Sequence, residues 1–259
     1  MDLGIRGRKA LLFGASRGLG KACATALAQE GVDVTIAART REVIDKACAE
    51  IRAATGATVT GVVADITTVD GRAAALATCP EPDILLNNAD GPLPGDFREW
   101  RRDDWIAALD AMMLGPIETM RLTVDGMMAR GFGRIVNILS RSIKISQAEL
   151  GLSNGARSGL AGFVAGLSRQ TVARNVTINN LLPGIFDSDA QVRHIEGMLE
   201  PGGKSFDQIW RERAAANPAK RFGRPEELGA YCAFLCSDHA GFVTGQNILV
   251  DGGSYPGTF

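Results

Sequence analysis

The sequence predicts an α/β protein in which one parallel sheet of about seven strands is doubly wound, with helices on both faces. Short apolar runs of strand length recur along the chain and alternate with segments of helical periodicity. The apolar runs are continuous rather than alternating, as in strands that are buried on both faces. No linker-like stretch rich in Pro and Ser divides the 259 residues, so a single domain over 1–259 is expected.

The expected strands share strand length and an apolar character. They span residues 9–13, 32–37, 58–63, 83–86, 133–138, 176–182 and 246–250. Helical segments lie between most of these runs, which gives strand–helix–strand units with right-handed crossovers. Ligands of such sheets bind at the carboxyl ends of the strands, near the point where the strand order reverses. A binding site is therefore expected at that edge.

A glycine-rich turn connects the first expected strand to a helix expected over 21–30. Its candidate cofactor-binding residues are Gly14, Ser16, Arg17, Gly18, Leu19 and Gly20. The glycines allow a tight turn and a close approach of the backbone to a ligand, and the helix N-terminus offers N–H groups and a partial positive charge to phosphate. Because strand, turn, helix and second strand follow in order, the pattern indicates a Rossmann-type dinucleotide site.

The second expected strand ends without an acidic residue. An acid there would bind the ribose hydroxyls of NAD, but Arg39 follows the strand instead, and Arg17 projects from the glycine turn. Two guanidinium groups suit a 2′-phosphate, because arginine binds phosphate oxygens in a bidentate fork. A solvated surface charge is the alternative for either arginine alone. The two together favour NADP(H) over NAD(H) as the cofactor.

The composition excludes several classes of function. The formal net charge of −1 gives no reason to expect nucleic acid or an anionic membrane as a partner. No apolar run reaches membrane-spanning length, and the first residues lack the shape of a signal peptide. The five cysteines are widely spaced and only two histidines are present, so buried thiols are expected and a metal site is not. We expect a cytoplasmic protein with a small-molecule substrate.

Further motifs stand where the later strands are expected to end. In chain order they are Asp65, Asn87-Asn88-Ala89, the segment Ile135-Val136-Asn137-Ile138-Leu139-Ser140, Pro183-Gly184 with Ser188 shortly after, and Val250-Asp251-Gly252-Gly253. Together with the glycine turn, this set resembles the short-chain dehydrogenase/reductase family essentially from end to end. The resemblance is closest in character to members similar to 3-oxoacyl-carrier-protein reductase.

The resemblance implies a role for each matched position. These are Asp65 and Ile66 at the adenine, Asn88 and Ala89 along the cofactor, and Pro183, Gly184 and Ser188 near the nicotinamide. A plain turn at Pro183-Gly184 and an Asn88 that only satisfies backbone groups are the structural alternatives. The resemblance also implies a homo-oligomer, either a tetramer or a dimer.

One segment, 187–217, interrupts the rhythm of strands and helices. It mixes Gly, Pro, charged residues and His194 between the end of a strand and a later helix. Long excursions at this position often act as substrate lids, so the segment is a candidate lid. A solvated insertion is the alternative that the sequence leaves open.

The proton-transfer positions depart from the family pattern. The family places a Tyr and a Lys four residues apart on one helix, and alignment on Ser140 puts Ser153 and Arg157 at those positions. The usual Asn becomes Met112, and the usual Gly after Asn-Asn-Ala becomes Asp90. A Tyr hydroxyl has an unperturbed pKa of about 10, whereas Ser is a far weaker acid and Arg stays protonated. Ser140, Ser153 and Arg157 remain candidate catalytic residues, as a cluster that binds an oxyanion.

Three hypotheses follow from this mixture of retained and altered motifs. The first is an NADP(H)-dependent oxidoreductase acting on a small carbonyl or imine, or the corresponding alcohol or amine, with Ser153, water or Asp90 in the proton path. The second is a protein that binds NADP(H) as a structural or sensing ligand. The third is a lyase-type reaction on the same scaffold. Other candidate acids are Lys144, Glu149, Asp187 and His194, and the two tyrosines, Tyr231 and Tyr255, match no catalytic position.

Overall fold

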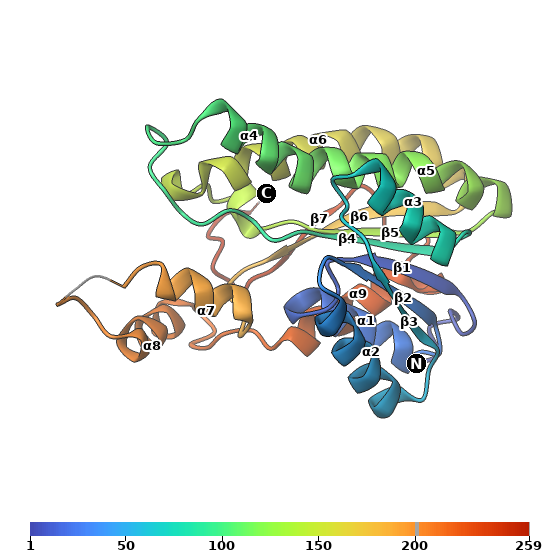
Figure 1. The fold of residues 1–259 in the computed structure, drawn as a ribbon, viewed down its shortest axis with the longest axis horizontal. Coiled ribbons are helices and arrows are strands. Elements are labelled where there is room, and N and C mark those ends of the chain that lie inside the picture. Colours follow the sequence, from blue (N-terminus) through green and yellow to red (C-terminus); the bar gives the residue numbers. More distant parts are fainter. Residues whose placement is uncertain (200–201, 259) are drawn as a thin grey trace.

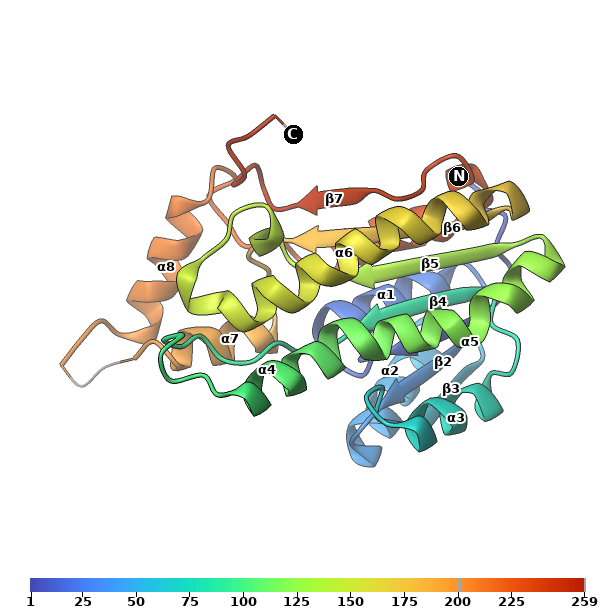
Figure 2. The same cartoon turned by 90° about the horizontal axis from the view of Figure 1, so that it is seen from above.

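A computed structural model of the chain describes residues 1–199 and 202–258. Its centre is a sheet of seven parallel strands in the order β3-β2-β1-β4-β5-β6-β7 (Figure 1, Figure 2). The order reverses between β1 and β4, because the chain adds strands first on one side of β1 and then on the other. The doubly wound α/β sheet expected from the sequence is therefore confirmed.

Each expected strand is present, with ends shifted by at most two residues. The strands are β1 (Lys9–Phe13), β2 (Asp33–Ala38), β3 (Val59–Val63), β4 (Ile84–Asn88), β5 (Gly133–Ile138), β6 (Val176–Pro183) and β7 (Asn247–Val250). Strands β5 and β6 are buried along their whole length, as expected of parallel strands covered on both faces, although both contain polar residues.

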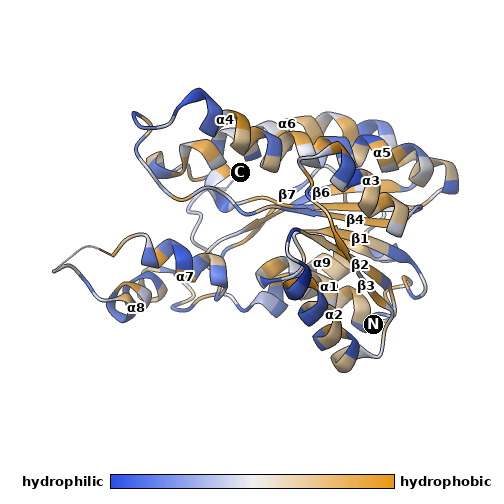
Figure 3. Cartoon of the chain, viewed as in Figure 1, coloured by the Kyte–Doolittle hydropathy of each residue, from blue (hydrophilic) through white to orange (hydrophobic). Residues whose placement is uncertain are grey.

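Helices cover both faces of the sheet (Figure 1). Helices α1 (Gly18–Gln29), α2 (Arg41–Thr55) and α9 (Pro225–Cys236) lie on one face, and α3 (Val69–Thr78), α4 (Arg102–Leu109), α5 (Gly115–Arg130) and α6 (Gly151–Thr171) lie on the other. Two apolar clusters fill the spaces between these helices and the sheet. Figure 3 shows the hydrophobic residues concentrated on the strands and the hydrophilic ones on helices and loops. All five cysteines are buried as free thiols. In the described ranges, no helix has both the length and the apolar character needed to cross a membrane.

The first helix corrects one expectation. It begins at Gly18, three residues before the expected start at Lys21, so the last part of the glycine turn is already helical. Backbone N–H groups of the turn consequently belong to the first turn of α1, where helices leave N–H groups without an internal partner. The correction places the positive end of the helix closer to the carboxyl edge of the sheet.

A row of asparagines joins four neighbouring strands inside the sheet. The side chains of Asn87, Asn137, Asn180 and Asn247 stand in register on β4, β5, β6 and β7. Each amide nitrogen donates to the next amide oxygen, at 3.0, 2.9 and 2.8 Å in order. A one-residue slip of any strand would leave buried amides without partners, so this row fixes the strand register.

The candidate lid folds as two helices that project beyond the sheet (Figure 1, Figure 2). They are α7 (Asp189–Glu196) and α8 (Phe206–Ala216), and residues 200 and 201 of the expected segment lie outside the described residues. The side chain of Ser188 caps α7 by accepting from the Gln191 backbone N–H at 3.4 Å. That the segment moves as a lid stays a prediction.

Candidate functional site

A cleft of about 640 Å³ opens at the carboxyl ends of the strands, over the point where the strand order reverses. Most residues predicted to bind the cofactor line it. These are Gly14, Ser16, Arg17, Gly18, Leu19, Arg39, Asp65, Ile66, Asn88, Ala89, Pro183 and Ser188. The exceptions are Gly20 and Gly184, which are not among the lining residues. The structure thus brings together side chains that are spread over most of the sequence.

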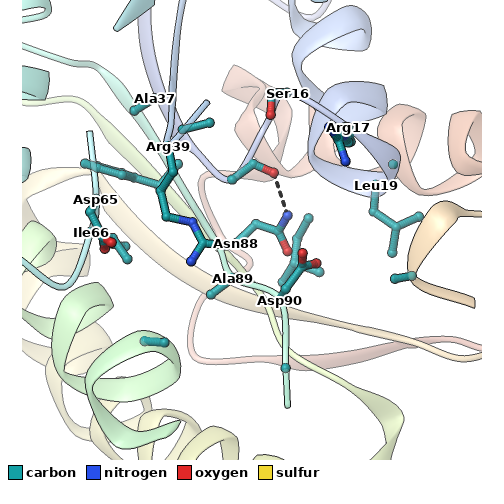
Figure 4. A pocket seen from close by; sticks show the side chains of 18 of the residues that line it. Ser16, Arg17, Leu19, Ala37, Arg39, Asp65, Ile66, Asn88, Ala89 and Asp90 are labelled. Atoms are coloured by element: carbon teal, nitrogen blue, oxygen red, sulfur yellow. Dashed lines mark hydrogen bonds between the residues drawn. The ribbon is translucent and has the colours of Figure 1, made fainter. Parts of the chain in front are cut away.

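The glycine turn is held in place from the neighbouring strand. Asn88 Nδ2 donates to the Gly14 carbonyl oxygen at 2.8 Å (Figure 4). Gly14 has a φ of +62°, and a Cβ there would collide with the Asn88 carbonyl. A Cβ on Gly20 would collide with the Gly14 carbonyl in turn, which gives Gly20 a supporting role although it does not line the cleft. Asn88 therefore satisfies a backbone group and shapes the site at once.

Two exposed arginines line the cleft at different places, Arg17 on the glycine turn and Arg39 after β2. Figure 4 shows Arg39 reaching into the cleft from the end of β2, with Asp65 and Ile66 beside it in this view. In the described part of the chain, neither Arg39 nor Arg17 forms an ion pair, so both guanidinium groups are available to an anion. Asp65 Oδ1 accepts from the Thr67 backbone N–H at 2.9 Å and from Thr67 Oγ1 at 2.7 Å, which fixes the direction of the carboxylate.

The opposite end of the cleft contains Arg157, which is only 8% exposed. Its Nη1 donates to the carbonyl oxygens of Ile138 at 2.7 Å and Leu139 at 3.0 Å, and its Nη2 donates to that of Ala89 at 2.9 Å. These carbonyls stand at the ends of β5 and β4. Burial lowers the pKa of Arg157 to about 10, against the opposing field of Asp90, so the side chain is a cation at neutral pH.

The two candidate catalytic serines occupy different environments. Ser153 Oγ accepts from Arg157 Nε at 3.1 Å and is 8% exposed. Ser140 Oγ accepts from the Ser142 backbone N–H at 3.1 Å and caps the short 3-10 helix η2 (Arg141–Ile143). Among the described residues, the lining of the cleft includes Arg157 but neither serine. The structure joins Ser153 to Arg157, and the roles assigned to all three residues stay predictions.

The Met112 position, where the family pattern expects Asn, lies in a π-helical turn. That turn, η1 (Asp110–Leu114), connects α4 to α5, and such turns are frequent at functional sites. Met112 is buried and packs with Ala108, Leu152 and Ala156. A Cβ built on Gly91 would lie 3.7 Å from Met112 Sδ and 3.8 Å from Arg157 Nη2. Apolar packing therefore fills space directly beside the buried guanidinium.

An ion pair at the cleft was not expected from the sequence. Asp90 Oδ2 lies 3.2 Å from Arg193 Nη2, and both residues line the cleft from opposite elements, the exit of β4 and helix α7. The two side chains are 65% and 44% exposed. Asp90 is among the candidate acids, but nothing in the sequence points to Arg193, because only the fold of α7 brings it to Asp90.

The remaining candidate acids lie on the lid and on the loop beyond Ser140. Burial and the Arg213 charge lower the pKa of His194, while Glu149 opposes them. Lys144 Nζ stands 5.4 Å from the centre of the Tyr255 ring, so the end of the chain packs on this loop. Tyr231 lies on α9 and is 39% exposed. In the described ranges, no group of three or more metal-binding side chains gathers.

Comparisons with known proteins agree with this arrangement. The family model described as Enoyl-(Acyl carrier protein) reductase matches residues 14–255. The NADPH-dependent reductase BacG of Bacillus subtilis is 30% identical over 252 residues, which cover 95% of this chain and 97% of that protein. The 3-oxoacyl-acyl-carrier-protein reductase FabG of Vibrio harveyi is 29% identical and covers 98% of this chain and 99% of its own length.

Solved structures show the same fold. The L-sorbose reductase of Gluconobacter frateurii, in complex with NADPH and L-sorbose, superposes with a TM-score of 0.94 at 27% identity, covering 99% of this chain and 100% of that one. The strand order, the glycine turn and the lining of the cleft are thus accompanied by similarity along nearly the whole sequence. The chain belongs to the short-chain dehydrogenase/reductase family.

Proposed function

We propose that the protein is an NADPH-dependent reductase of a small carbonyl or imine, or works on the corresponding alcohol or amine in reverse. The observation that carries the proposal is the dinucleotide cleft, in which Asn88 holds the glycine turn and Arg17 and Arg39 line the cleft without an ion pair among the described residues. Those guanidinium groups fit a 2′-phosphate. Relatives and structural neighbours named as NADPH-dependent or bound to NADPH support this cofactor.

The proposed site uses Ser140 to orient the reacting oxygen and Arg157 to stabilise negative charge that develops on it. NADPH, when bound, supplies the hydride. Ser153 Oγ already accepts from Arg157 Nε, so its own hydrogen is free to be directed elsewhere. Ser153 or a water next to it is the proposed proton donor, with Asp90 as a further candidate that would first have to leave its pair with Arg193.

The chemistry limits the substrates that suit such a site. A positioned general acid contributes about 10²–10⁴ in rate, and a serine hydroxyl is a poor substitute for tyrosine. An imine needs less from the proton donor, because a protonated iminium accepts hydride without further proton transfer. The Arg157 cation favours the alkoxide that develops from a ketone but opposes the charge of an iminium, so the matched ketones and imines are compared directly.

A second candidate function is that of an NADPH-binding protein without turnover. Two observations favour it. Most N–H groups of Arg157 donate to backbone carbonyls, and Met112 packs in an apolar cluster beside it. In this case the cofactor would act as a structural or sensing ligand, while the cleft would bind it equally well.

The test separates binding from turnover. NADPH and NADH are titrated into the protein, and the absorbance of NADPH is then followed against a matched panel of ketones and imines. Turnover that falls in Ser140→Ala, with NADPH affinity unchanged, supports the reductase. Tight NADPH binding without turnover on any substrate supports the second function, and absence of NADPH binding contradicts both.

A further inference from the structure

Arg157 is a buried cation whose hydrogen bonds go to neutral groups. Its partners are three backbone carbonyls and the Ser153 hydroxyl, at 2.7 to 3.1 Å. Within the described residues, no carboxylate lies within 4 Å of its nitrogens. Dipoles at the ends of β4 and β5 thus hold the charge in place without neutralising it, and a charge so deeply buried is screened little by solvent.

Asp90 is the acidic residue whose field reaches Arg157, and it is already engaged. Its Oδ2 atom pairs with Arg193 at 3.2 Å, and the pair is neutral as a whole. Asp90 is also 65% exposed, so water screens much of its field. The buried end of the cleft consequently keeps a net positive charge.

The cleft has a direction that places the nicotinamide at this end. Arg39 and Asp65 stand at the far end, which suits the adenosine and its 2′-phosphate, and the glycine turn with the start of α1 suits the pyrophosphate. The remaining part of a dinucleotide must then extend toward Arg157, Pro183 and Ser188, which line the other end. The nicotinamide ring is neutral in NADPH and carries a positive charge in NADP⁺.

We propose that the uncompensated charge of Arg157 makes the protein select the redox state of its cofactor, binding NADPH in clear preference to NADP⁺. The inference rests on the proposed cofactor but not on any proton donor, and it holds for the reductase and for the sensing function alike. A tenfold preference for the reduced form raises the potential of the bound couple by about 30 mV. In a reductase it also promotes release of NADP⁺ after hydride transfer.

The experiment measures dissociation constants of NADPH and NADP⁺ separately, by calorimetry, without substrate. We expect the intact protein to bind NADPH at least about tenfold more tightly than NADP⁺. Arg157→Gln keeps hydrogen-bond donors but removes the charge, so the two affinities should approach each other. Arg157→Lys keeps the charge and should keep the preference.

Arg134→Gln is the matched control. Arg134 is also a buried guanidinium that donates to backbone carbonyls, those of Ser237, Gly133 and Asn175, at 2.8 to 3.0 Å. It stands at the start of β5, the end of the strand away from the cleft. Its loss should lower stability and leave the ratio of the two affinities unchanged.

Asp90→Asn is a second test, at an exposed residue, and its expected effect on the preference for NADPH is opposite to that of Arg157→Gln. It releases Arg193 and removes a negative charge, so the preference for NADPH should increase by a few fold even if Arg157→Gln does not fold. Equal affinities in the intact protein, or no increase in Asp90→Asn, would overturn the inference while leaving the proposed function intact. If neither nucleotide binds, the proposed function fails instead.

Discussion

The two ends of one cleft differ in what their side chains are doing. In the part of the cleft that suits the adenosine and the pyrophosphate, Arg39 and Arg17 are exposed and unpaired among the described residues, and the glycine turn is shaped for phosphate. At the opposite end, Arg157 is bonded to the protein on most sides, and Met112 packs in an apolar cluster. The polar groups of one end are free to bind a ligand, whereas those of Arg157 at the other end are mostly hydrogen-bonded within the protein. Holding a dinucleotide and transferring a proton are therefore encoded by separate residues, so one can change while the other is kept.

Rebuilding the proton-transfer end is the change with the largest expected effect. Ser153→Tyr and Arg157→Lys together restore the residues that the family pattern expects, and Met112→Asn removes the thioether beside them. If the lack of a general acid limits turnover, the rate of ketone reduction by NADPH should rise by about 10²–10⁴ fold. Initial rates of NADPH oxidation measure it, and Ser153→Phe with the same two partners serves as the control without a hydroxyl. An equally active Phe variant would show that the hydroxyl is not the missing element.

A side chain in the glycine turn should weaken the binding of NADPH. Gly14→Val places a β-branched side chain at a φ of +62° and against the Asn88 carbonyl, so the turn must shift. We expect NADPH affinity to fall by about 10² or more. Gly162→Ala is the matched control, because a Cβ at Gly162 meets nothing within 4 Å and lies on helix α6. Its affinity should equal that of the intact protein, as measured by fluorescence titration.

The preference for NADPH over NADH is expected to depend on Arg39, which follows β2. Arg39→Asp replaces a phosphate-binding cation with an acid suited to ribose hydroxyls. The ratio of NADPH to NADH affinity should fall by about 10 to 100 fold, since hydrogen bonds between charged groups contribute about 1.5–3 kcal/mol. Arg41→Asp is the control, because Arg41 is an exposed residue of α2 whose Nη1 lies 3.6 Å from Asp45 Oδ1. A similar loss in both variants would point to net charge rather than to a phosphate contact.

The sequence predicts the fold further than it predicts the site. The seven strands can be predicted because apolar runs of strand length, alternating with helical segments, are local patterns in the sequence. The row from Asn87 to Asn247 was not, because an asparagine in a strand reveals its partner only when the register is known. The lining of the cleft followed from motifs at strand ends. The pairing of Asp90 with Arg193 did not, since it depends on how α7 folds back over the cleft.

Arg157 shows a different limit of the sequence. Its position on the helix was predicted from alignment, and its closeness to Ser153 from helical spacing. That its donors meet carbonyls of β4 and β5 depends on side-chain packing, which no local pattern encodes. The interpretation of the site changes accordingly, because a guanidinium bonded to the backbone is a fixed charge before it is a catalyst.

The smallest expected effect concerns the candidate lid, which contains His194. Burial and the charge of Arg213 lower the pKa of His194 below its ordinary 6.5, with Glu149 opposing. The unfolded chain therefore takes up a proton near pH 6.5 that the folded chain still refuses, so stability falls as the pH drops through and below that value. His194→Gln should reduce this loss of stability, as measured by thermal unfolding and by hydrogen exchange of α7 and α8 between pH 7.5 and about 5.

His239→Gln is the control, because His239 is the second histidine, is exposed and lies beside the Asp2 carbonyl. An equal change in both variants would mean that the pH dependence of stability arises from other groups.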